Sequence, residues 1–282
     1  MQPTDQAQRI AYWTEQMEQA HGFMMAILDY PVRECGEPMV SMEEAARAAG
    51  VDIEFSRTPF APGYERVFYL RRGLIDDFLN IAEDLNGRGW VMLVEDGFRS
   101  TAMQRDLAKK PGIFDVILQR LLWECNGELP SPEFMFRRAS ALVATIPKIG
   151  THMSGSAIDI SVLNRGDRTP VDRGGPYVEL SERTPMRSPF VSPEALRNRA
   201  EITEMFEVHG LMAYPFEFWH YNKGDAYDEY LNQTGSPARY GAIDWDPQTG
   251  AITPIADPKQ PLHSTEDIRA EIEKALRRLK TL

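Results

Sequence analysis

The pattern of apolar and polar residues predicts a chain in which helices and strands alternate. Apolar residues recur at steps of three and four from Ile10 to Ile27, which is typical of an amphipathic helix, and Tyr30-Pro31 ends it. Similar patterns, with start or stop signals at their ends, predict further helices at residues 74–85, 100–110, 113–124, 132–145, 193–209 and from 264 onward.

Other segments fit strands better than helices. They are residues 90–94, 156–163 and 212–221, with a further short strand and a turn of helix expected within residues 36–56. The segment 156–163 alternates between apolar and polar side chains. Ile158, Ile160 and Val162 should therefore share one face of the strand, which leaves Asp159 on the other face.

Two long segments show neither the three-and-four spacing of a helix nor the alternation of a strand. Residues 164–192 are rich in Gly, Pro, Arg and Ser and predict a long surface loop, while residues 232–262 hold five prolines and predict irregular structure. We expect a helical extension at 1–30, a main domain at 31–245, and an irregular segment with a helix at 246–282. The apolar stripe of the first helix either docks on the main domain or forms a contact between two copies of the chain.

Composition narrows the function classes. The 282 residues are 43% hydrophobic, which is enough for a sizeable core, and the formal net charge of −11 disfavours nucleic acid as a partner. The two cysteines, Cys35 and Cys125, form no CxxC pair, so a cysteine-based zinc site is excluded and a disulfide framework is not expected. No segment has the apolar length of a membrane span and no secretion signal opens the chain, so we expect a cytoplasmic protein without a membrane partner.

Three short stretches, residues 95–99, 151–159 and 217–221, together supply what a hydrolytic zinc site needs. His152, Asp159 and His220 offer two imidazoles and a carboxylate, and three protein ligands leave a fourth position open for water. Glu217 lies three residues before the second imidazole, where it could accept a proton from that water. Arg99 offers a rigid positive fork for a developing oxyanion. Each stretch alone is also compatible with a structural role.

The spacing of these residues sets conditions on the backbone. His152 and Asp159 are seven residues apart and would point to opposite faces of one regular strand. Gly155 between them allows a turn, so that His152 precedes the strand and Asp159 projects from it. Glu217 and His220 can share a face if the chain bends between them.

The three stretches resemble the signatures of the zinc D-Ala-D-Ala dipeptidases, the vancomycin-resistance-type branch of the zinc D,D-peptidases. The matching motifs are D-G-F-R ending at Arg99, H-x-x-G-S-A-I-D from His152, and E-F-W-H ending at His220. The resemblance runs from about Cys35 to about Tyr240, so the main domain would be the catalytic domain. It implies the α+β fold of hedgehog-type and D-Ala-D-Ala peptidases, with an antiparallel sheet flanked by helices.

The resemblance also implies roles for individual residues. His152, Asp159 and His220 would bind one Zn²⁺ per chain, Glu217 would be the base, and Arg99 would stabilise the carbonyl oxygen. The implied reaction is hydrolysis of the cell-wall-derived dipeptide D-Ala-D-Ala. Alternatives are a D,D-carboxypeptidase that acts on longer peptidoglycan peptides, and a binding module that retains zinc without catalysis.

The chain departs from the dipeptidase pattern at several positions. Ser100 replaces a usual proline and Thr151 a usual serine, and residues 178–185 lack the Gly-x-x-Phe-Asp element that helps to shape the substrate pocket. As substitutes we expect Glu179 and Glu182 to receive the substrate ammonium. The remaining expected substrate-binding residues are Thr151 and Trp219.

Overall fold

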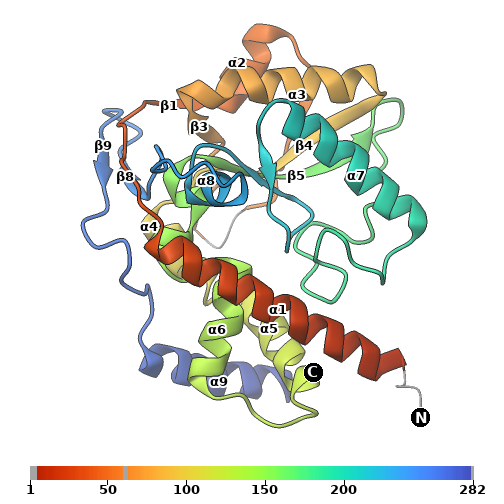
Figure 1. Ribbon diagram of the computed structural model, residues 1–282, viewed down its shortest axis with the longest axis vertical. Coiled ribbons are helices and arrows are strands. Elements are labelled where there is room, and N and C mark those ends of the chain that lie inside the picture. The colour runs from red at the N-terminus through yellow and green to blue at the C-terminus, as the bar shows by residue number, and fades with distance from the viewer. Residues whose placement is uncertain (1–4, 60–62, 281–282) are drawn as a thin grey trace.

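A mixed sheet forms the centre of the protein. The computed structural model describes residues 5–59 and 63–280. Within them, five strands pair in the order β2-β4-β5-β7-β6 (Figure 1). Their bounds are β2 Ile53–Phe55, β4 Trp90–Asp96, β5 Ala157–Asn164, β6 Met212–Ala213 and β7 His220–Asn222. β2 runs parallel to β4 and the other neighbours are antiparallel, which confirms the predicted α+β class but adds a parallel strand at one edge.

Helices pack in two groups around this sheet (Figure 1). One group covers a face of the sheet and consists of α2 (Met42–Ala49), α3 (Ile75–Gly87) and α7 (Pro193–Val208). The other group packs into a separate layer of α1 (Asp5–Asp29), α5 (Pro111–Glu124), α6 (Pro132–Val143) and α9 (Thr265–Leu279). Smaller elements are α4 (Thr101–Leu107), α8 (Ala226–Leu231) and the strand pairs β1–β3 (Met39–Ser41, Tyr69–Arg71) and β8–β9 (Ile243–Trp245, Ile252–Pro254).

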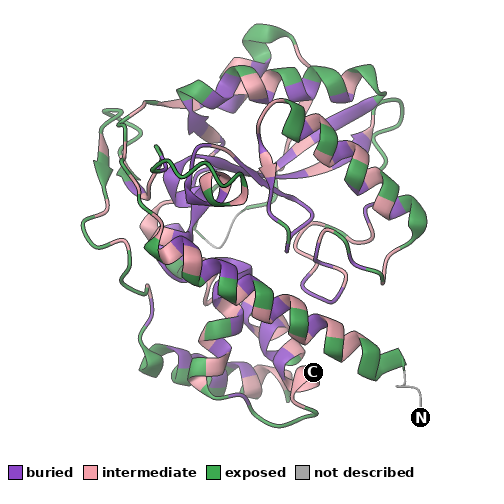
Figure 2. Cartoon of the chain, viewed as in Figure 1, coloured by how far each residue is buried: buried purple, intermediate pink, exposed green. Residues whose placement is uncertain are grey.

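Strand β5 separates two hydrophobic cores. Ile158, Ile160 and Val162 are buried with α3 and α7 in one core, as their alternation predicts. Another core holds the α1, α5, α6 and α9 layer together with aromatic residues of the segment between β6 and β7. Figure 2 shows buried residues on the central strands and on parts of the helices around them. Asp159 is buried on the face of β5 away from the first of these cores.

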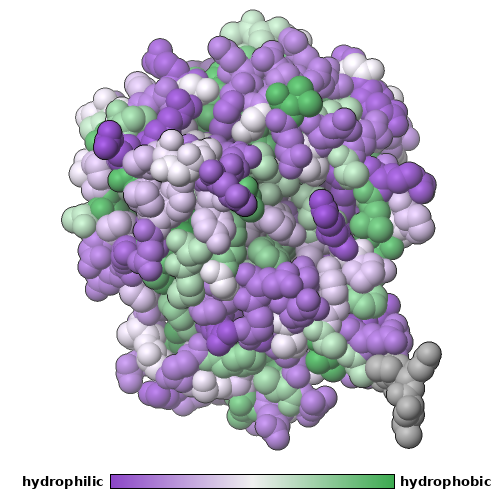
Figure 3. All heavy atoms as spheres, viewed as in Figure 1, coloured by the Kyte–Doolittle hydropathy of each residue, from purple (hydrophilic) through white to green (hydrophobic). Residues whose placement is uncertain are grey.

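The apolar stripe of α1 docks within the chain. Its residues Trp13, Met17, Ala20, Met24 and Ile27 are at most 2% exposed and belong to the helical core. The outer surface in Figure 3 is mostly hydrophilic, with apolar residues interspersed. Of the two alternatives that the sequence allows, the stripe therefore docks within the chain and is not available for a contact between two copies.

The prediction of one continuous strand over residues 212–221 is wrong. β6 and β7 form a hairpin whose connecting turn contains Glu217, and the Glu217 amide donates to the Tyr214 carbonyl at 3.2 Å. Pro215 has no N–H to give to a strand ladder, which favours the break. The bend required between Glu217 and His220 is therefore present.

The irregular segments are more ordered than their composition indicates. Residues 164–192 contain no helix or strand beyond β5, yet Leu180, Thr184 and Ser188 in this segment are at most 4% exposed. The segment is therefore packed rather than a surface loop. Residues 232–262 include the β8–β9 pair, which the sequence does not predict. Among the described helices, none combines the length and apolarity of a bilayer-spanning segment.

Replacing Met17 by alanine should destabilise the protein by about 2–5 kcal/mol, because the side chain is fully buried under α1 and its removal leaves a cavity. Met25 on the same helix is 36% exposed, so Met25→Ala should change stability by about 0.5 kcal/mol or less. Urea unfolding of both variants measures this difference. Equal effects would show that α1 does not dock as described.

Candidate metal centre and active site

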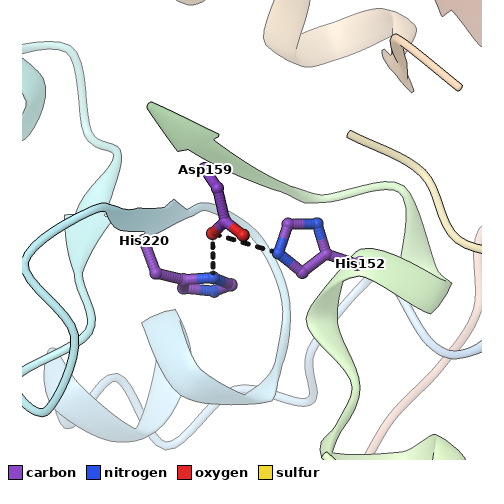
Figure 4. A group of neighbouring side chains, drawn as sticks. All are labelled: His152, Asp159 and His220. Carbon is purple, nitrogen blue, oxygen red and sulfur yellow. Dashed lines mark hydrogen bonds and ion pairs between the residues drawn. The ribbon is translucent and has the colours of Figure 1, made fainter. Parts of the chain in front are cut away.

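His152, Asp159 and His220 converge at the end of the sheet (Figure 4). Asp159 Oδ1 lies 3.2 Å from His152 Nε2 and 2.9 Å from His220 Nδ1. One ligand atom from each residue lies within 4.8 Å of the other two, and all three side chains are buried. This spacing suits ligand atoms that each lie about 2.0–2.2 Å from one zinc ion.

Three different elements carry these residues. His152 lies in the short 3₁₀ turn Thr151–Ser154, and Gly155 follows it with a φ of 69°, a left-handed conformation that glycine adopts without strain. Asp159 lies in β5 directly opposite His220 at the start of β7. The turn at Gly155 thus brings His152 and Asp159 together, as the sequence requires.

Hydrogen bonds leave one nitrogen of each imidazole directed at Asp159. His152 Nδ1 donates to the Gly97 carbonyl at 2.7 Å, and its buried Nε2 has no hydrogen-bond partner. His220 Nε2 lies 2.9 Å from Thr151 Oγ1, which leaves Nδ1 on the side of Asp159. Outer partners of this kind fix the orientation of metal-binding histidines. Thr151, expected to contact substrate, thus positions His220.

The second oxygen of Asp159 is held by other residues. Asp159 Oδ2 accepts from Arg99 Nη2 at 3.1 Å and from the Tyr177 hydroxyl at 3.0 Å. Oδ1 therefore faces the imidazoles while Oδ2 is fixed in place. Sequence reasoning did not identify Tyr177, which lies in the irregular segment 164–192 and offers no motif to identify it.

A β-bulge places Asp96 opposite Asp159. β4 pairs Val94 with Ile160 and then Asp96 with Asp159, so Glu95 is the extra residue. Without the bulge, Glu95 would be opposite Asp159; instead it accepts a hydrogen bond from Ser161 at 2.7 Å. Bulges often redirect side chains next to active sites in this way.

Asp96 and Gln104 orient the guanidinium of Arg99. Arg99 Nε donates to Asp96 Oδ2 at 2.8 Å, and Nη1 donates to Gln104 Oε1 at 3.3 Å. Burial alone would lower the pKa of Arg99, but Asp96 and Asp159 raise it, so the side chain stays cationic. The sequence indicated Arg99 but gave no signal for Gln104.

Burial sets the protonation states of the cluster. It lowers the pKa of His220, which keeps this imidazole in the neutral form that binds metal. Burial would raise the pKa of Asp159, yet His152 and His220 hold it well below its usual range. For Glu217, burial and then the charge of Asp159 raise the pKa well above its usual range. Glu217 is therefore suited to exchange protons.

These residues line one cavity of about 100 Å³, room for several water molecules. The three candidate ligands, Arg99, Glu217, Thr151 and Trp219 all line it, together with Tyr177, Arg66 and Lys110. Apolar residues of the helical layer close another side, including Met24 of α1 and Leu142 of α6.

Glu179 and Glu182 are not among the described residues that line this cavity. Arg183 Nη2 donates to Glu179 at 2.9 Å, and Arg9 Nη1 donates to Glu182 at 2.7 Å. Both carboxylates pair with arginines within the chain, which corrects the expectation that they face the substrate ammonium.

Comparisons with known proteins agree with the motifs. Residues 133–237 match the family model described as D-ala-D-ala dipeptidase, a range that holds His152, Asp159, Glu217 and His220. The chain is 25% identical over 229 residues to the D-alanyl-D-alanine dipeptidase of Synechocystis sp., covering 70% of this chain and 86% of that protein. These matches confirm the predicted resemblance to the D-Ala-D-Ala dipeptidases.

Two solved structures are similar at a lower level. One is the zinc complex of a mutant of VanY, a vancomycin resistance D,D-pentapeptidase, with 15% identity, a TM-score of 0.36, and coverage of 76% of this chain and 97% of that chain. The other is the LD-carboxypeptidase LdcB, with 17% identity, a TM-score of 0.38, and coverage of 74% and 80%. At these scores the fold class rests on this chain's own elements.

Tyr177→Phe should weaken zinc binding by about 10–100-fold, because Asp159 loses a donor that fixes its carboxylate while every ligand atom remains. Tyr64→Phe is the matched control, since the Tyr64 hydroxyl bonds to exposed Asp106 away from the ligands. Competition with a chelator of known affinity measures both variants. Equal affinity in Tyr177→Phe and the wild type would remove Tyr177 from this role.

Proposed function

We propose that this chain is a zinc-dependent D-Ala-D-Ala dipeptidase with one zinc ion held by His152, Asp159 and His220. The observation that carries the proposal is the buried Nε2 of His152, which has no hydrogen-bond partner and faces the other two candidate ligands. A neutral nitrogen in this position fits a metal ligand. When bound, zinc supplies Lewis-acid activation of water and of the scissile carbonyl.

The chain's own residues provide the remaining chemistry. Glu217 accepts a proton from the attacking water and passes it to the leaving amine, a role that suits a carboxyl group with a raised pKa. Arg99 is held in place by Asp96 and Gln104, so its fixed charge is ready for the developing oxyanion. Apolar residues line part of the cavity beside these groups, and the lower local dielectric strengthens both interactions.

Cavity size and charge support a small D,D-peptide as substrate. A cavity of about 100 Å³ lined by both cations and carboxylates suits a small charged peptide. A free dipeptide derived from the cell wall is met inside the cell, so we also propose a cytoplasmic location.

Glu217→Gln should lower kcat on D-Ala-D-Ala by about 10²–10⁴-fold while the zinc content stays near that of the wild type, because the amide cannot accept the proton. Glu207→Gln, which removes an exposed carboxyl group outside the cavity, is the control and should keep full activity. Metal analysis and a ninhydrin assay of released alanine give the two readouts. Substantial turnover by Glu217→Gln would contradict its role as base.

N-acetyl-D-Ala-D-Ala should be cleaved with a lower kcat/KM than D-Ala-D-Ala, but it should be rejected less strongly than a strict dipeptidase rejects it. The carboxylates on the described cavity wall are Asp96, Asp159 and Glu217, and each already has another role, so no spare carboxylate awaits an ammonium. Comparable kcat/KM on the two substrates would favour the D,D-carboxypeptidase alternative. Strong rejection of the acetylated form would show that another group binds the ammonium.

A further inference from the structure

The cavity wall carries more positive charge than the proposed reaction uses. Arg66, Arg99 and Lys110 all line it, facing the carboxylates of Asp96, Asp159 and Glu217. Binding a divalent ion would leave this wall with an excess of positive charge. Arg99 has a role in the chemistry, whereas Arg66 and Lys110 have none so far.

The charge of Arg66 is only partly compensated. Its side chain is 10% exposed, and its Nε donates to the Thr58 carbonyl at 2.8 Å. Nη1 is buried without a hydrogen bond and lies 3.5 Å from Asp96 Oδ2, the oxygen that already accepts from Arg99 at 2.8 Å. One carboxylate oxygen therefore serves two guanidinium groups.

Lys110 places a second cation on the same wall. It is the N-cap residue of α5 and is half-buried, so its ammonium lies near the positive end of that helix. Burial, and next the charge of Arg66, lower the pKa of Lys110, which indicates that the two cations repel each other. An anion bound between them would remove this cost.

We propose that Arg66 and Lys110 form a subsite that binds the free C-terminal carboxylate of the substrate. The inference rests on the proposed peptidase function and names a specificity determinant for it. Arg66 shares Asp96 with Arg99 and lies 5.8 Å from the centre of the Tyr177 ring, whose hydroxyl contacts Asp159. The proposed subsite therefore shares its cavity with the candidate zinc ligands and adjoins the residues that hold Arg99 and Asp159 in place.

The test compares D-Ala-D-Ala with its C-terminal amide. Arg66→Gln should lower kcat/KM for the free acid by about 10–100-fold, the scale of one lost hydrogen bond to a charged group, and lower that for the amide far less. Lys110→Gln should show the same pattern and remains informative if Arg66→Gln does not fold. Arg57→Gln and Lys109→Gln are matched controls. Arg57 is exposed and pairs with Glu43, and Lys109 is partly exposed and pairs with Asp267 outside the cavity.

A binding measurement separates the subsite from the reaction. In calorimetric titration, the zinc-loaded Glu217→Gln variant should bind D-Ala-D-Ala more tightly than the C-terminal amide. The double variant Glu217→Gln/Arg66→Gln should bind both with the same affinity. Equal losses on both substrates, or unchanged selectivity, would overturn the carboxylate subsite. If the wild type cleaves neither substrate yet binds the acid selectively, the proposed reaction fails while the subsite stands.

Discussion

The site depends on one buried carboxylate, that of Asp159. Its Oδ1 brings His152 and His220 together, while its Oδ2 is fixed by Arg99 and Tyr177. An isolated charge at this depth would be too costly, so these contacts are what keep it ionised. The same contacts determine where a metal ion would bind and where Arg99 points. The carboxylate therefore couples the candidate ligands to Arg99.

The fold supplies this carboxylate with rigid support. Alternation in β5 buries Ile158 and Ile160 in one core and turns Asp159 to the opposite face. The bulge at Glu95 then places Asp96 opposite Asp159, within reach of Arg99. Groups on strands are held more precisely than groups on loops, which suits a reaction that needs fixed geometry. The helical layer around α1 completes the cavity from the other side.

The sequence predicts those parts of the site that follow from local patterns. Alternation in β5 places Asp159, and the glycine at position 155 predicts the turn that brings His152 beside it. The partners of these residues cannot be predicted in this way. The bulge depends on hydrogen bonds between strands that are far apart in the chain. Tyr177 lies in a segment with neither the helical nor the strand pattern of apolar residues. The expectation for Glu179 failed because composition does not show that Arg183 pairs with it.

With a divalent ion bound, the charge of the cavity wall would differ in sign from that of the whole chain. The net charge of −11 would weakly repel an anionic substrate at long range. At physiological salt, screening reduces such interactions beyond about 8 Å, so the charges nearest the substrate decide its binding. Arg66 and Arg99 lie within that distance of each other through their shared contact with Asp96. An acidic protein can therefore receive a carboxylate, because a few cations gather on the wall of one cavity, where their charges act at short range.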